Sequence, residues 1–171
     1  MLNLDEIKKI FLNLREAKRK QFNRVLPFGD YISDRWEKAK YLGFGDGTSV
    51  YDNVVILGNV KVGSNTWIGP NVVLDGSGGL EIGSNCSIST GVQIYSHDSI
   101  KWATSGGKEK YEYSKTIIED NCYIGPNVVI SKGITIGKCS IIGTNSFVNK
   151  DIPPFSKAFG TPIKIKEIKN L

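Results

Sequence analysis

The stretch that decides the fold covers residues 118–148 and reads IEDNCYIGPNVVISKGITIGKCSIIGTNSFV. Every sixth residue in it is aliphatic, and the residue that follows is often glycine. The third residue after each aliphatic position is usually Asn or Gly, and the fourth is small or β-branched. Asn and Gly readily adopt the left-handed backbone of a tight corner, whereas β-branched residues favour extended segments. Each hexamer therefore predicts one short strand and one corner.

The same period extends upstream to residue 50, with two extra residues inserted once and a long interruption after residue 94. Three strands of this length make a triangular coil of about eighteen residues, and stacked coils form a parallel β-helix. A β-sandwich is disfavoured, because hairpin proteins do not hold a strict period of six. We therefore predict an all-β solenoid of about five coils. The aliphatic positions are Val50, Ile56, Val62, Ile68, Leu74, Ile82, Ile88, Ile94, Ile118, Ile124, Ile130, Ile136, Ile142 and Val148.

Three segments flank or interrupt the predicted solenoid, which covers residues 50–152. Residues 1–49 are expected to form a helix over 4–20, packed on the solenoid or on a partner subunit, and an irregular cap over 27–49. Residues 99–115 break the period as a long protruding loop. Residues 153–171 predict a closing strand or short tail.

Composition excludes several classes of protein. The chain has 171 residues, one His and three Cys without C-x-x-C spacing, which disfavours a site of several imidazoles, a zinc site and a disulfide framework. The 22 basic and 17 acidic residues are a mild excess, which suits a small polyanionic ligand better than nucleic acid. Apolar runs are too short to span a membrane, and the start lacks the pattern of a secretory signal, so we expect a cytoplasmic protein.

The single histidine is the sharpest functional feature. His97 lies three residues after Ile94, where the repeat usually places Asn or Gly at a corner, so we expect it to be accessible and fixed by the coil. Asp98 follows it at a position that otherwise holds a small neutral residue. The long loop then begins, and it contains Trp102, Tyr111, Tyr113 and a Gly-Gly pair. A base beside such a loop predicts a substrate site with a lid, although a corner histidine beside a tolerated insertion remains an alternative.

The period also predicts a column of lysines. If the loop leaves the phase unchanged, Lys132 and Lys150 stack on the side that carries His97, and Lys164 and Lys166 extend the column. Such a column suits an elongated ligand with phosphates at one end and a reactive group at the other. Solvated surface lysines are the plainer interpretation.

Three sequence features together resemble the hexapeptide-repeat acetyltransferases, with the sugar O-acetyltransferases of surface-polysaccharide clusters as the closest branch. They are the repeats 68–73 and 124–129, both IGPNVV, the segment GVQIYSHD at 91–98, and the ending 151–164. The resemblance implies a left-handed β-helix, a homotrimer with active sites between subunits, acetyl-coenzyme A as donor and His97 as general base. The family tail usually reads Gly-Asn-Pro-Ala-Lys, and here Thr161 and Ile163 replace Asn and Ala.

The predicted chemistry is attack of a sugar hydroxyl on the thioester, with imidazole taking the hydroxyl proton. Asp98 either orients the ring or holds its own corner. Asp75, Trp102 and Tyr111 are candidate acceptor contacts, and no metal is expected. The resemblance places coenzyme A along a row of donor contacts: Gly125, Lys132, Gly143, Thr144, Asn149, Lys150, Lys164 and Lys166.

The sequence lacks features that two other kinds of enzyme require. A β-helical carbonic anhydrase needs three histidine ligands, and a sugar-nucleotide pyrophosphorylase needs a large preceding domain. Acetylation of an antibiotic or an amino sugar stays open within the same mechanism. A non-catalytic β-helix that serves in assembly is the alternative from a different class.

Overall fold

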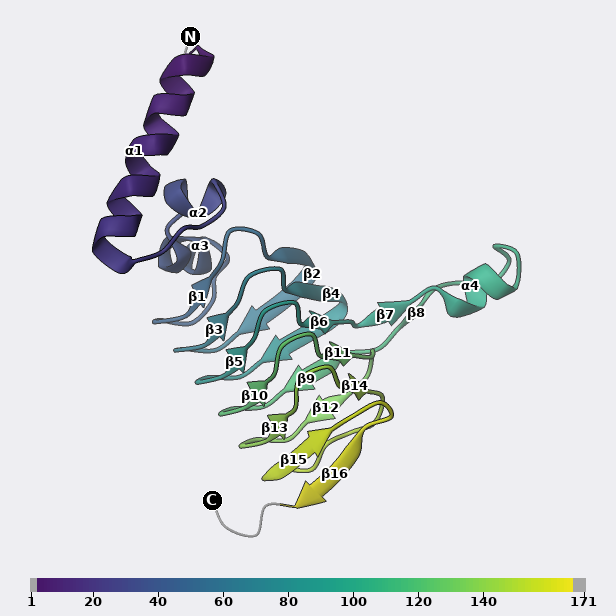
Figure 1. Ribbon diagram of the computed structural model, residues 1–171. Helices are drawn as coiled ribbons and strands as arrows, with labels where there is room; N and C mark the ends of the chain where they lie inside the picture. Colours follow the sequence, from purple (N-terminus) through teal and green to yellow (C-terminus); the bar gives the residue numbers. More distant parts are fainter. Residues whose placement is uncertain (1–2, 168–171) are drawn as a thin grey trace.

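The structure, a computed structural model, describes residues 3–167 as a stack of coils with helices at one end and a ribbon projecting from the side (Figure 1). The helices are α1 (Leu4–Phe22), α2 (Gly29–Ile32), α3 (Arg35–Tyr41) and α4 (Ile100–Thr104). The strands are β1 (Ser49–Val50), β2 (Val55–Val62), β3 (Trp67–Ile68), β4 (Val73–Ile82), β5 (Ser87–Ile88), β6 (Gln93–Ile94), β7 (His97–Asp98), β8 (Glu112–Tyr113), β9 (Thr116–Ile118), β10 (Tyr123–Ile124), β11 (Val129–Ile130), β12 (Thr135–Ile136), β13 (Ile141–Ile142), β14 (Phe147–Val148), β15 (Ser156–Phe159) and β16 (Lys164–Glu167).

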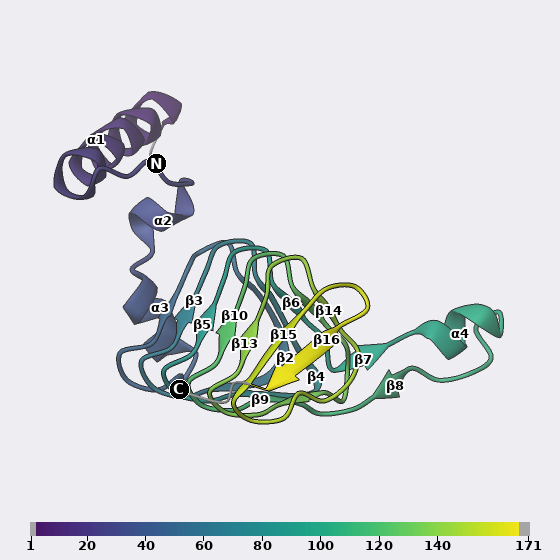
Figure 2. The same cartoon turned by 60° about the horizontal axis from the view of Figure 1, so that its bottom comes forward.

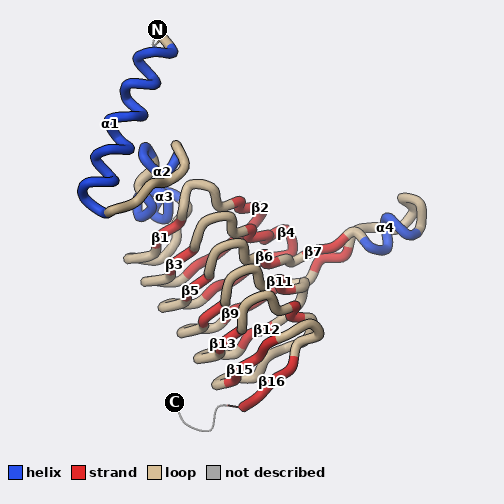
Figure 3. The backbone as a smooth tube through the Cα atoms, in the orientation of Figure 1, coloured by secondary structure: helices blue, strands red, loops and turns tan. Residues whose placement is uncertain are grey.

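The coils repeat in the predicted register. Ile130 pairs in parallel with Ile94 on one side and with Val148 on the other, so the ribbon interrupts the chain without changing its phase. The solenoid has about six turns, one more than the period predicted, because β15 closes a further coil beyond the last hexamer. Most strands are two residues long, and loops join them at the corners (Figure 3).

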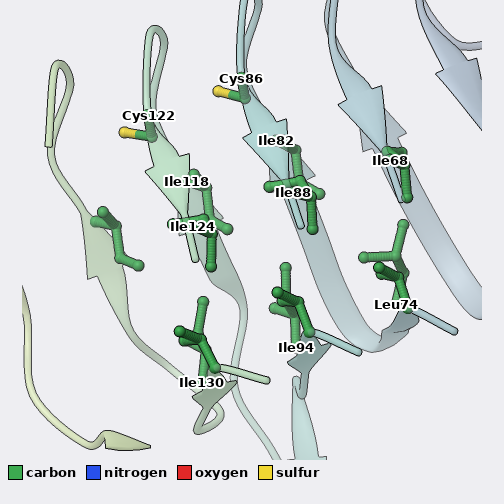
Figure 4. Packing of buried hydrophobic residues seen from close by; sticks show 14 of the residues in the cluster. Ile68, Leu74, Ile82, Cys86, Ile88, Ile94, Ile118, Cys122, Ile124 and Ile130 are labelled. Carbon is green, nitrogen blue, oxygen red and sulfur yellow. The ribbon is translucent and has the colours of Figure 1, made fainter. Parts of the chain in front are cut away.

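The aliphatic positions form continuous ladders inside the coils. Ile68, Ile88 and Ile124 stack in one row, and Leu74, Ile94 and Ile130 stack in another (Figure 4). These side chains are fully buried. Because each side chain packs on its equivalent in the next coil, the hexapeptide period is also the period of the core.

Asparagine at the corners has the backbone conformation that the pattern predicted. Six corner asparagines have φ between 54° and 61°: Asn65, Asn71, Asn85, Asn121, Asn127 and Asn145. Cys139 takes the same conformation at a seventh corner, with φ of 57°. An L-residue adopts this conformation at a cost, and the short polar side chain of Asn lowers that cost.

A buried ladder of hydroxyl and thiol groups binds successive coils at another column. Thr66 donates to the carbonyl of Gly83 at 2.8 Å, and Cys86 donates to that of Glu119 at 3.2 Å. Cys122 continues the column, donating to the carbonyl of Gly137 at 3.3 Å, and all three cysteines are free thiols. Cys86 and Cys122 therefore occupy a structural position in the coil that Ser or Thr occupies in neighbouring coils.

The helix predicted over residues 4–20 is present as α1, but it does not pack on the solenoid. An Asn3–Glu6 capping box starts it. Phe11 contacts Phe28 and Tyr31, with ring centroids 5.6 and 5.7 Å apart, and α1 stands away from the coils (Figures 1 and 2). α1 buries none of its residues, and apart from Phe11 its apolar side is largely exposed, as at Leu4, Ile7 and Ile10.

The cap over the first coil is helical rather than irregular. Lys38 on α3 donates to the carbonyls of Tyr51 and Asp52 at 3.0 and 2.6 Å, which attaches the helix to the coil. At the other end of the solenoid, β16 runs antiparallel to β15. It is the closing strand, one of the two forms that the sequence predicted for this segment. No helix within residues 3–167 is long and apolar enough to cross a membrane.

Candidate functional site

His97 begins the ribbon that leaves the solenoid. It starts β7 and pairs with Tyr113 of β8 in an antiparallel arrangement, and the ribbon rejoins the coils at Thr116 (Figure 2). The predicted corner position is therefore wrong, since His97 has an extended strand conformation and is absent from the residues of positive φ. The expected access is present, because 28% of the imidazole is exposed.

The ring partner of His97 is Asp75, from the coil before it. The Nδ1 atom of His97 lies 2.5 Å from Oδ2 of Asp75, which is completely buried. Oδ2 also accepts from the backbone N–H of Ser96, and Oδ1 accepts from that of Ser77, both at 3.0 Å. A carboxylate can only accept, so Nδ1 carries the proton and the neutral ring keeps its lone pair on Nε2.

The Asp75 carboxylate is held in its charged form. Burial on its own raises the pKa of a carboxyl group, but here hydrogen bonds from Ser77, Ser96 and His97 outweigh it and lower the pKa of Asp75 to about 2. The expectation that Asp75 contacts an acceptor is wrong, because its side chain is sealed beneath the imidazole. Asp75 instead fixes the tautomer of the ring.

Aromatic rings line the ribbon beside the imidazole. Tyr113 and Tyr111 stack on His97, with ring centroids 5.8 and 6.2 Å away and interplanar angles of 22° and 20°. Trp102 on α4 meets Tyr111 edge-on at 5.6 Å. The structure thus brings the predicted Tyr111 to His97, and the predicted Trp102 packs on Tyr111. Tyr113 lies in the same loop but was not among the predicted acceptor contacts, although alternation along a strand gives residues 111 and 113 the same face.

Asp98 does not orient the imidazole. Its Oδ2 atom lies 2.5 Å from Nζ of Lys132, and its Oδ1 atom accepts from the backbone N–H of Ile100 at 3.0 Å. Of the two roles left open by the sequence, Asp98 therefore has the local one of holding its own turn. Lys132 also reaches Glu112 at 2.9 Å, so it is engaged in ion pairs rather than standing open for a phosphate.

A cleft of about 400 Å³ opens next to His97 on the outer face of the coils. Val129 and Phe147 form its apolar floor, and they occupy consecutive coils because β11 pairs with β14. The rest of the wall is formed by Tyr95, Asp98, Ser99, Ile100, Ser131 and Lys132. The cleft can hold an extended, partly apolar group with one end at the imidazole.

Besides Lys132, the predicted donor contacts fall into two groups. The first group is Gly125, Gly143, Thr144, Asn149 and Lys150. Gly125 and Gly143 stack in consecutive coils as predicted, and a Cβ at Gly125 would come 2.8 Å from the backbone nitrogen of Thr144. Thr144, Asn149 and Lys150 are exposed, and Lys150 follows Val148 one coil beyond Lys132.

Lys164 and Lys166 do not extend the lysine column. They lie on β16, which joins the sheet of β10, β13 and β15, whereas Lys132 and Lys150 follow strands of the other seven-stranded sheet. The Nζ atom of Lys166 instead lies 5.8 Å from the centroid of the Phe159 ring. Within residues 3–167, no group of three His, Cys, Asp or Glu side chains could hold a metal ion.

Two family models match the solenoid. The model described as bacterial transferase hexapeptide (six repeats) matches residues 115–150, and that described as hexapeptide repeat of succinyl-transferase matches residues 59–96. These repeats match a left-handed β-helix, which agrees with the hand that the resemblance implied.

Curated relatives are similar to this chain in sequence. The galactoside O-acetyltransferase of Lactococcus lactis is 33% identical over 130 residues, which are 75% of this chain and 53% of that protein. The galactoside O-acetyltransferase of Escherichia coli is 31% identical over 130 residues, and the match covers 64% of each chain. The chain thus spans between half and two thirds of the length of these relatives.

A solved hexapeptide-repeat acetyltransferase from Vibrio cholerae, in complex with acetyl-coenzyme A, is 27% identical with a TM-score of 0.71. The match covers 98% of this chain and 91% of that one, so the helices as well as the coils have counterparts. An N-acyltransferase from Bacillus cereus, 20% identical with a TM-score of 0.66, shares the fold over 74% of this chain.

Proposed function

Because the chain belongs to the hexapeptide-repeat acetyltransferase family, we propose that it transfers an acetyl group from acetyl-coenzyme A to a hydroxyl group of a sugar or glycan. The observation that carries this proposal is the buried Asp75 carboxylate beneath the exposed His97 ring, at the mouth of an apolar cleft. A hydroxyl group is a poor nucleophile at neutral pH and needs a base of this kind.

The proposed reaction uses His97 as the base and then as the acid. Nε2 of His97 takes the proton of the acceptor hydroxyl as its oxygen attacks the thioester carbonyl. The C–S bond then breaks, and the imidazolium returns the proton to the departing sulfur. The products are an acetyl ester and the free thiol of coenzyme A. Asp75 stabilises the imidazolium between the two proton transfers, because its charge lies against Nδ1.

The cleft suits the acyl donor. We place the pantetheine arm against Val129 and Phe147, with the thioester at His97 and the phosphates toward the exposed Lys150. Gly125, Gly143, Thr144 and Asn149 remain proposed donor contacts, since they occupy the corners next to the same coils. Lys132 leaves this set because two carboxylates already bind it.

The aromatic face of the ribbon suits the acceptor. Tyr111, Tyr113 and Trp102 form a contiguous set of rings that begins at the imidazole. Sugar rings present apolar C–H faces that pack on aromatic side chains, while their hydroxyl groups remain directed to the side. A sugar on these rings would bring a hydroxyl group to Nε2.

An acceptor screen tests the proposal. Purified protein is incubated with acetyl-coenzyme A and with free sugars, sugar nucleotides, lipid-linked glycans, amino sugars and streptogramin antibiotics in separate reactions. We expect thiol release that depends on a hydroxylated sugar, with the acetyl ester identified by mass spectrometry. An acetyl amide on an amino sugar would move the acceptor class to amines, and an absence of acceptor-dependent thiol release would refute acetyl transfer.

We also propose that the working unit is a homotrimer. The resemblance implies it, and the exposed apolar residues of α1, including Ile7 and Ile10 at 41% and 43% exposure, support a partner. Light scattering should give three times the mass of one chain. A stable monomer at micromolar concentration would be incompatible with active sites shared between subunits.

A further inference from the structure

The ribbon that carries His97 has two chemically different faces. Alternation along paired strands sends residues 97, 111 and 113 to one face and residues 98 and 112 to the other. The first face holds the imidazole and the stacked tyrosines. The second holds two carboxylates, Asp98 and Glu112, which are direct cross-strand partners.

Two like charges that face each other across a strand pair repel and destabilise the pair. A two-stranded ribbon is also marginally stable without other support. The ribbon therefore needs a cation on its charged face if its aromatic face is to keep a fixed geometry.

Lys132 supplies that cation from the body of the solenoid. It follows β11, the strand next to β6, so its backbone is anchored in the rigid stack of coils. Its Nζ atom contacts both carboxylates, at 2.5 Å from Asp98 and 2.9 Å from Glu112, and 22% of the side chain is exposed. Lys101 on α4 binds the other oxygen of Glu112 at 2.5 Å.

The charges in this cluster sustain one another. The hydrogen bond from Lys132 lowers the pKa of Asp98, and those from Lys101 and Lys132 lower the pKa of Glu112. Both carboxylates therefore remain ionised across the neutral range, and Lys132 stays paired with both of them there.

We infer that Lys132 is a positioning residue, which fixes the ribbon so that Tyr111 and Tyr113 stay stacked on His97 and the acceptor site keeps its shape. In its kinetic consequences this role rests on the proposed function. The sequence alone suggested that Lys132 is a phosphate ligand. Loss of such a ligand would weaken the binding of acetyl-coenzyme A, whereas loss of a positioning residue weakens the binding of the acceptor.

Replacing Lys132 with Met keeps the length of the side chain and removes its charge. We expect the KM for the acceptor to rise about tenfold, because small displacements of a binding face are costly. The KM for acetyl-coenzyme A should stay within about twofold, because Met fills the place of Lys132 in the wall of the cleft. Lys132→Arg can still bind both carboxylates and should restore the acceptor KM. Lys61→Met is the matched control, because Lys61 pairs with Glu81 on the coils at 3.8 Å, and its removal leaves the bond between Lys115 and Glu81 in place.

A second readout does not depend on catalysis. His97 is the only histidine in the chain, so its ring C–H signals in an NMR spectrum of histidine-labelled protein are assigned without ambiguity. The stacked tyrosines shift these signals by their ring currents. We expect Lys132→Met to move the signals toward those of a solvent-exposed histidine, and Lys132→Arg and Lys61→Met to leave them in place.

The outcomes separate the inference from the proposed function. Unmoved His97 signals in folded Lys132→Met protein would overturn the positioning role. A raised KM for acetyl-coenzyme A with an unchanged acceptor KM would also overturn it and make Lys132 a donor ligand. If the wild-type protein transferred no acetyl group, the proposed function would fail, and the NMR comparison would still decide whether Lys132 holds the ribbon.

Discussion

Replacing His97 with Ala is expected to lower acceptor-dependent acetyl transfer by about 10²- to 10⁴-fold, the range that a positioned general base contributes. The reason is that Nε2 of His97 is the proposed proton acceptor, and the substitution leaves the hydroxyl group without a base. Thiol release from acetyl-coenzyme A, followed at saturating concentrations of both substrates, measures the effect on kcat.

Loss of packing under the tyrosines must be separated from loss of the base. His97→Gln retains a polar group that can donate to Asp75, and it fills most of the space beneath Tyr113. We expect this variant to bind acetyl-coenzyme A with unchanged affinity and to be as inactive as His97→Ala. Near-wild-type turnover in either variant would remove His97 from the mechanism.

The coil was predictable because one physical requirement repeats in every hexamer. Each anchor must pack on its equivalent in the next coil, and each corner needs a residue that accepts the left-handed conformation. Ile94, Ile130 and Val148 therefore show the correct phase across the interruption at residues 99–115. The number of coils was underestimated because β15 closes the last coil with Ala158 at the core position instead of an aliphatic anchor.

The partner of His97 was not predictable from neighbouring residues. Asp98 was one candidate for the ring partner because it is adjacent in sequence, but adjacent residues of a strand point to opposite faces. Asp75 is 22 positions away and meets the ring because Leu74, the residue before it, pairs with Ile94 in the next coil. Its position just before the two-residue insertion was the available signal.

The lysine column shows the same limit. Stacking predicted correctly that Lys132 follows the coil next to the one that carries His97. The stacking of coils does not predict that the chain returns along β8, which brings Glu112 next to Lys132. Contacts made by an insertion depend on its own pairing, and the hexapeptide period says nothing about that pairing.

Replacing Asp75 with Asn is expected to lower kcat by about 10²- to 10⁴-fold with little change in the acceptor KM. The amide has no charge to stabilise the imidazolium, and its N–H₂ group can turn toward Nδ1 and favour the wrong tautomer. Asp75 is fully buried beneath the ring, so its loss should not remove an acceptor contact. A raised acceptor KM with an unchanged kcat would overturn the role of Asp75 in stabilising the imidazolium.

The same substitution should change the acid stability of the fold. The pKa of Asp75 is about 2 in the folded protein, below the ordinary value of 3.8. A lowered folded-state pKa contributes stability that is fully present above about pH 4 and is lost as the pH falls toward 2. The difference corresponds to about 2 kcal/mol.

Guanidinium unfolding of wild type and Asp75→Asn between pH 7 and pH 2 tests this linkage. The wild-type protein should be the more stable above pH 4, both because the carboxylate is charged there and because the amide cannot accept from both Ser77 and Ser96. The gap between the two proteins should narrow as the pH falls from 4 to 2. Parallel stability curves over that interval would show that Asp75 is not ionised in the fold, and the proposed stabilisation of the imidazolium would lose its charge.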